Sequence, residues 1–126
     1  MAVVQQVPSV TLTQGSQAGG AQVNTATLAA VAGKTNYLEG FDVTGGGATA
    51  ASIIEISVTG LLGGTVKYEM AVLAGVTAPV NAQGGYSLRL PTPFPASGPN
   101  VAIAVAVPSF GAGNTNASVV AVGQVI

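Results

Sequence analysis

The stretch ASIIEISVTGLLGGTVKYEMAVL, residues 51–73, decides the fold class of this chain. In its second half, apolar side chains at every other position alternate with Lys67 and Glu69. Its first half places three β-branched residues on one face, namely Ile54, Ile56 and Val58. Period-two alternation is typical of half-buried strands, and the glycine-rich segment between the two halves is typical of a hairpin loop. The stretch therefore predicts two neighbouring antiparallel strands.

Runs rich in valine, isoleucine, threonine and tyrosine, which favour strands, continue on both sides of this hairpin. They predict five further strands, at residues 23–31, 35–43, 86–90, 101–107 and 117–125. Residues 7–13 are an eighth candidate, which Pro8 would restrict to the edge of a sheet. We therefore expect an all-β fold: an antiparallel β-sandwich of jelly-roll type, with seven or eight short strands and long glycine- and proline-rich loops.

Three of the connecting segments have recognisable turn chemistry. Residues 44–47 and 111–116 are rich in glycine and are expected to be loops. Residues 91–95, PTPFP, contain three prolines, which exclude helix and central strand and predict an extended crossover.

The length of 126 residues suits a single domain. We expect residues 21–126 to form the sandwich and residues 1–20 to form an N-terminal arm, joined by a flexible polar link at residues 14–20. The arm contains four valines that are candidate interface residues: Val3, Val4, Val7 and Val10. An apolar arm of this kind can add to the sheet edge of a neighbouring subunit.

The scarcity of charge is the strongest feature of the composition. Charged residues make up 6% of the chain, against roughly 25% in an ordinary soluble domain. The cores of protein interfaces are depleted in charge, so we expect much of this surface to be covered by other subunits. A plain compositional bias towards small residues is the alternative. Residues 101–107 leave the same choice open, because the second face of this strand is all alanine and could pack against another layer or be covered within the monomer.

The residue inventory argues against an enzyme. The chain has no histidine and no cysteine, which removes zinc ligands and the usual activators of a nucleophile. Lys67 is expected to form an outward ion pair with Glu69 rather than to activate a serine. Glu39 and Asp42 are three residues apart and should face opposite sides of a regular strand. We expect no catalytic residue, no cofactor and no metal. Asp42, close to the glycines of residues 44–47, is the candidate for a calcium ligand, but a hairpin explains this segment better than a calcium site does.

The sequence also argues against binding to nucleic acid and against a membrane-spanning helix. Three basic residues cannot supply the clustered positive charge that binds nucleic acid. No run of about 18 apolar residues is free of glycine, proline or polar breaks, so we expect no membrane helix.

Five segments form a series along the chain: AGKTNYL (32–38), GFDVTGGG (40–47), TGLLGGT (59–65), PTPFPA (91–96) and GAGNTNA (111–117). Together they resemble small virion proteins of tailed bacteriophages, and most closely head decoration (capsid cement) proteins. The resemblance covers roughly residues 33–122 and lies in the loop sequences taken together, not in one diagnostic motif. It carries over no catalytic residue.

The resemblance implies a β-sandwich or jelly-roll subunit, often a dimer or trimer, on the outer surface of a virion capsid. Such proteins bridge neighbouring subunits of the major capsid protein and stabilise the shell against the pressure of the DNA inside. The alternative is a binding module of a phage tail, fibre or baseplate. A glycan-binding site in such a module would need aromatic side chains that cluster in one loop region. Tyr37, Tyr68 and Tyr86 lie instead in predicted strands, so we expect them to be core residues.

Overall fold

The computed structural model describes residues 9–18, 22–74, 85–114 and 116–126, and every regular element in these residues is a β-strand. The strands are β1 (Ser9–Ala18), β2 (Asn24–Leu28), β3 (Asn36–Gly46), β4 (Ser52–Thr59), β5 (Val66–Val72), β6 (Tyr86–Pro95), β7 (Ile103–Val107) and β8 (Asn116–Val125). The all-β prediction is therefore confirmed. Within the described ranges, no helix is long and apolar enough to cross a membrane.

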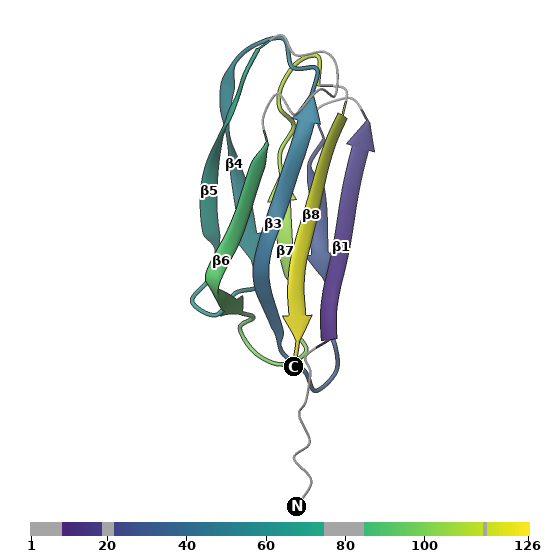
Figure 1. Ribbon diagram of the computed structural model, residues 1–126, viewed down its shortest axis with the longest axis vertical. Coiled ribbons are helices and arrows are strands. Elements are labelled where there is room, and N and C mark those ends of the chain that lie inside the picture. Colours follow the sequence, from purple (N-terminus) through teal and green to yellow (C-terminus); the bar gives the residue numbers. More distant parts are fainter. Residues whose placement is uncertain (1–8, 19–21, 75–84, 115) are drawn as a thin grey trace, which may run out of the picture.

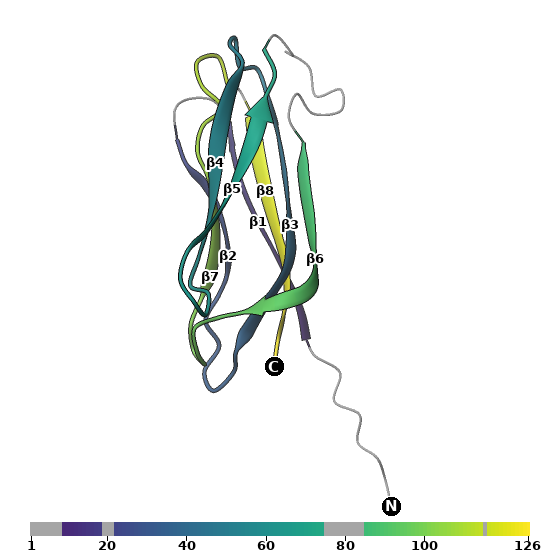
Figure 2. The same ribbon diagram turned by 90° about the vertical axis from the view of Figure 1, so that its left-hand side faces the viewer.

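The strands form two four-stranded antiparallel sheets that pack face to face (Figures 1 and 2). Sheet A has the order β1-β8-β3-β6 and sheet B the order β2-β7-β4-β5. The pairs β1–β8, β2–β7, β3–β6 and β4–β5 are those of one long hairpin that folds the chain back on itself. The pairs β3–β8 and β4–β7 then roll this hairpin into two sheets, which is the strand order of a jelly roll.

The core lies between the two sheets and is filled by alternate residues of the strands. Ile54, Ile56 and Val58, the apolar face that the sequence predicts for β4, are all buried. The largest fully buried side chains come from both sheets and from the loop after β7: Phe41, Phe110, Leu28, Leu38, Ile56 and Ile103. Burial of this apolar surface, at about 25 cal/mol per Å², is the main source of stability.

Three aromatic rings close the core where β5 and β6 face each other. The ring of Phe41 lies edge-on to Tyr68 at 5.5 Å and stacks with Tyr86 at 5.8 Å between centroids. Burial raises the pKa of the Tyr68 hydroxyl above its ordinary value. Tyr37 was expected in the core as well, and this is wrong. It alternates with the buried Asn36 and Leu38 and therefore lies on the outer side of sheet A.

Three buried asparagines join segments that are distant in the chain. The Asn24 amide in β2 donates to the carbonyl oxygens of Gly15 and Ala117, 3.0 Å each, and so ties sheet B to sheet A. Asn36 and Asn114 act in the same way at the two ends of β3, Asn114 by donating to the Gly46 carbonyl oxygen at 2.8 Å. Because buried carbonyls without a donor are costly, these amides hold the sandwich in one arrangement.

The first strand corrects the prediction of a flexible link. Ser9–Ala18 pairs along its whole length with β8, so residues 14–18 are an edge strand of sheet A rather than a linker. The glycine in this stretch is there for close packing: a Cβ on Gly15 would collide with the carbonyl oxygen of Thr25 in β2 and approach the Asn24 Oδ1 to 2.8 Å. Residues 1–8 and 19–21 lie outside the described residues.

A β-bulge in β3 corrects a second prediction. Leu38 pairs with Gly123 and Gly40 with Val122, so Glu39 is an extra residue on this strand. The bulge shifts the alternation: Leu38 is buried before it, and Phe41 is buried after it. The argument that Glu39 and Asp42 face opposite sides assumed a regular strand, and it therefore fails.

Two expected loops also turn out to be partly strand. β3 continues to Gly46, with Gly45 paired to Ala117, so the glycine loop after it is shorter than predicted. β6 continues through the proline segment to Pro95, which pairs with Tyr37. Its register jumps between Arg89 and Phe94, so the ladder with β3 is interrupted in between. β6 is an edge strand, where proline is tolerated because one side of the strand needs no partner.

Replacing Thr13 with valine is expected to raise the free energy of unfolding by about 1 kcal/mol. The Thr13 hydroxyl is buried and has no hydrogen-bond partner among the described residues. Valine has nearly the same shape and removes the unsatisfied oxygen. Urea denaturation would measure the change; Thr25→Val, at an exposed position of β2, serves as the control and is expected to change stability by less than about 0.5 kcal/mol. A less stable Thr13→Val variant would contradict the prediction.

Candidate interaction surfaces

The outer face of sheet A carries an apolar patch along β1 and β8. Leu12 is 66% exposed and pairs with Val122, and Val120 lies two residues further along β8 on the same face. Val120 and Val122 are half-buried. We call Leu12, Val120 and Val122 the β1–β8 patch. The patch offers a flat apolar surface to a partner.

The four candidate interface valines are only partly within the described residues. Val10 belongs to β1, where it pairs with Gln124 of β8 beside the β1–β8 patch. Val3, Val4 and Val7 lie outside the described residues, and their role as an interface stays a prediction. Sequence reasoning placed Val10 in an arm and missed Leu12, although both stand at alternate positions of one strand.

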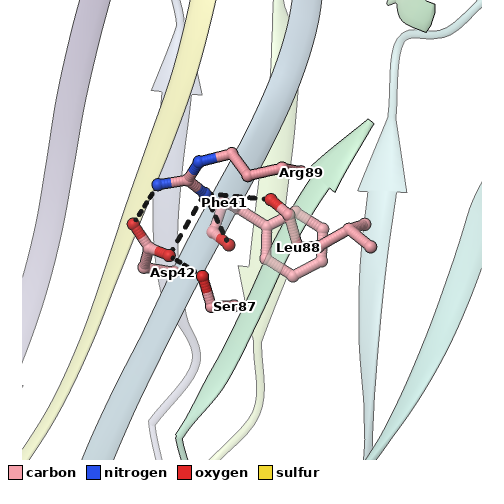
Figure 3. Close-up of polar contacts among 5 residues, drawn as sticks. All are labelled: Phe41, Asp42, Ser87, Leu88 and Arg89. Atoms are coloured by element: carbon pink, nitrogen blue, oxygen red, sulfur yellow. Dashed lines mark hydrogen bonds and ion pairs between the residues drawn. The ribbon is translucent and has the colours of Figure 1, made fainter. Parts of the chain in front are cut away.

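An arginine crosses the bulge on the outer face of sheet A (Figure 3). The Arg89 guanidinium binds both carboxylate oxygens of Asp42, at 2.8 and 3.1 Å, and its Nη1 also donates to the Leu88 carbonyl oxygen at 2.9 Å. A longer contact, 3.5 Å, reaches the Phe41 carbonyl oxygen. The Ser87 hydroxyl donates to the same carboxylate at 2.6 Å. The group therefore satisfies backbone and carboxylate oxygens at the bulge.

Gly40 makes room for this arginine. A Cβ at Gly40 would collide with the Leu88 carbonyl oxygen and lie 3.0 Å from the Arg89 Cδ and Nη1. Asp42, which the sequence offered as a calcium ligand, is instead held by Arg89 and Ser87. In the part of the chain that the structure describes, no three carboxylates lie close enough to hold a metal ion.

Converting Asp42 to asparagine is expected to flatten the loss of stability in acid. The hydrogen bond from Arg89 is the largest cause that lowers the Asp42 pKa below 3.8, its ordinary value. A carboxylate with a lowered pKa stabilises the folded state above its unfolded-state pKa, and this contribution disappears as the pH falls through the folded-state value. The window is therefore below about pH 4.

Urea midpoints between pH 5 and 2 would test this. The slope should be shallower in Asp42→Asn than in the natural chain, and Ser87→Ala, which removes a smaller cause of the lowered Asp42 pKa than Arg89, should give an intermediate slope. Equal slopes in all three proteins would rule out this role of the ion pair.

The outer face of sheet B combines small residues with a short charged row. Lys67 pairs with Glu55 on the neighbouring strand β4, 2.8 Å between Nζ and Oε1, and not with Glu69 as the sequence suggested. Lys67 stands opposite Ser57, so Glu55 is its diagonal neighbour on the adjacent strand, a position that a long lysine side chain can reach. Glu69 stands opposite Glu55, so two like charges meet on this face.

The alanine face of β7, the second face of residues 101–107, lies on the outer side of sheet B. β7 is a central strand between β2 and β4, and Ala104 and Ala106 are half-buried on the outer side of sheet B. They pair with Thr27 and Thr25 of β2, so the centre of this face is flat. No further layer of the described chain covers it.

Other exposed apolar side chains are scattered over the molecule. Ile53, 71% exposed, lies on the outer face of β4, and Leu73 follows the end of β5. Leu62 is exposed in the hairpin loop between these strands, which confirms the loop predicted there. Single apolar residues of this kind are normal on a protein surface, whereas the β1–β8 patch is continuous.

These surfaces are candidates for contact with a partner through shape and apolar side chains. Their charged groups are the bidentate Arg89–Asp42 pair, the Lys67–Glu55 pair, Glu39 and Glu69. Comparison with known proteins adds no identification: no family model, no curated protein and no solved structure matches this chain.

Proposed function

We propose that this chain is a virion structural protein that binds the outside of a phage capsid and bridges neighbouring subunits of the major capsid protein. The supporting observation is a jelly roll in which strands β1, β8, β2 and β7 carry no charged residue and Leu12 is exposed on the outer face of sheet A. Interface cores have this depletion of charge. The resemblance of the loops to capsid cement proteins supports a capsid as the surface that this protein covers.

The physical basis of such a role is repetition. Each copy would bury a modest apolar area, worth about 25 cal/mol per Å², at a junction of the shell. A subunit that contacts two neighbours at once gains from the high effective concentration of the second contact. Many weak junctions then resist the outward pressure of the packaged DNA together.

Reconstitution would test the proposal. The purified chain is added to emptied, expanded capsids of the encoding phage that were prepared without it, with unexpanded capsids as the matched control. We expect saturable binding to the expanded shells and an increase in the temperature at which they break. Shells that bind none of the protein, or that survive heat and osmotic shock equally well without it, would overturn the proposal.

Labelling distinguishes the alternative place in the virion. Gold-labelled antibody against the chain should decorate heads of intact particles in electron micrographs. Label confined to the tail, fibre or baseplate would instead assign the chain to a tail binding module and would reject the capsid role.

A further inference from the structure

The charged residues of the strands lie on one side of the sandwich. Strands β1, β8, β2 and β7 contain no charged residue at all. The charged strand residues all belong to β3, β4, β5 and β6: Glu39, Asp42, Glu55, Lys67, Glu69 and Arg89. The sheet orders place β1 and β8 together in sheet A, and β2 and β7 together in sheet B. One half of the sandwich is therefore neutral, and the β1 and β2 edges form its boundary.

The four edge strands differ in how well they are protected against pairing. An edge is usually blunted by proline, by charge, by short length or by irregular register. β6 has three prolines and a register jump. β5 carries Lys67 and Glu69, and β2 has 5 residues. β1 has 10 residues with neither a proline nor a charge, and it pairs with β8 without a register shift.

We propose that β1 pairs antiparallel with β1 of a second copy across a two-fold axis, joining the two copies of sheet A into one eight-stranded sheet. In Figure 1, β1 lies at the right-hand margin of sheet A with no strand of that sheet beyond it. A two-fold axis brings each edge against itself, so a charge near the axis would meet its own copy. The neutral β1 edge avoids this cost, whereas the β5 edge would bring Lys67 and Glu69 close to their counterparts.

The β1–β8 patch adds apolar contact to this junction. Leu12 is 66% exposed beside Val122, and a second copy at the edge would cover it together with its symmetry mate. Main-chain hydrogen bonds between edges supply affinity, and the side chains on the two faces fix the register. This dimer extends the proposed function by naming the oligomer that would bind the capsid, and its test in solution does not depend on a capsid.

Charge introduced on the two halves of the sandwich tests the dimer. Leu12→Lys places a lysine at the β1 edge, and Ile53→Lys is the matched control, since both leucine and isoleucine are exposed, 66% and 71%. We expect light scattering to give a dimer mass for the natural chain and for Ile53→Lys. The dissociation constant of Leu12→Lys should be at least about tenfold higher, as expected from losing about 1.4 kcal/mol. A monomer at all concentrations in the natural chain, or dissociation caused by Ile53→Lys alone, would overturn the proposal.

Cross-linking gives an independent measurement that needs no charge. The chain has no cysteine, so any disulfide in a single-cysteine variant must join two copies. Cysteine is placed at each of positions 10–17 except Gly15, one at a time, with Ile53→Cys as the control. Two-fold antiparallel pairing brings one position directly opposite itself, within the Cα separation that a disulfide allows. We expect one position to cross-link at least about tenfold faster than Ile53→Cys; uniformly slow cross-linking along β1 would reject the pairing.

Discussion

Replacing Asn36 with leucine is expected to lower the free energy of unfolding by about 3 kcal/mol, because it leaves three carbonyl oxygens without their donor. The Asn36 amide nitrogen donates to the carbonyl oxygens of Leu28, Ala29 and Val101, at 3.3, 2.8 and 3.0 Å. These carbonyls belong to the end of β2 and to the segment before β7. Asn36 itself is 1% exposed at the start of β3, so water cannot readily replace the amide.

The variant Asn36→Asp separates the hydrogen bonds from the packing. Aspartate keeps the shape of the side chain but presents oxygen where the carbonyls need a donor, so we expect a loss at least as large as in Asn36→Leu. Urea denaturation at pH 7 would measure both variants. A stable Asn36→Asp protein would show that the three hydrogen bonds contribute little and that only the volume of the side chain matters.

Replacing Gly60 with alanine is expected to have a similarly large effect, about 3 kcal/mol, for two reasons that add. Gly60 has φ 86°, in the left-handed region that costs an L-residue about 1–2 kcal/mol. A Cβ there would also collide with the carbonyl oxygen of Ala102. The loop cannot easily withdraw, because the Gly60 carbonyl oxygen accepts a hydrogen bond from the Ser97 amide at 2.9 Å.

Gly63 in the same loop is the matched control. Its φ is 95°, but a Cβ at this position would have no neighbour within 4 Å. Gly63→Ala should therefore show the conformational cost alone, about 1 kcal/mol. The difference between the two thermal or urea transitions measures the close approach to Ala102. Equal losses of unfolding free energy in the two variants would mean that the backbone conformation alone accounts for the effect at Gly60.

Strand periodicity was the part of the fold that local sequence could predict well. The alternation around Lys67 and Glu69 predicts β5, and the hairpin to β4 follows from the glycines between them. The errors lie where a tertiary contact decides the backbone. Gly15 suggested a flexible linker, but it lies in a strand and is glycine because β2 packs too close for a Cβ. Glu39 suggested a regular strand, but it is the extra residue of a bulge that Arg89 supports from β6.

The sequence suggested what kind of surface to look for, but not which residues form it. The scarcity of charge indicated a covered surface, and Val10 was singled out within residues 1–20. Which residues stand together on that surface depends on the strand order. Leu12 meets Val122 only because β1 pairs with β8, more than a hundred residues later in the chain. No local pattern reports such a pairing, since it is set by the rolling of the whole hairpin.

The sequence by itself determined the strand content of this protein and its nearly neutral surface, because alternation and composition act residue by residue. Only the tertiary structure decided that β1, β8, β2 and β7 gather into one uncharged half while every charged strand residue lies in the other. The physical reason is that neighbours in a jelly roll come from opposite ends of the chain. The scarcity of charge is a property of the chain, whereas its concentration on one side is a property of the fold.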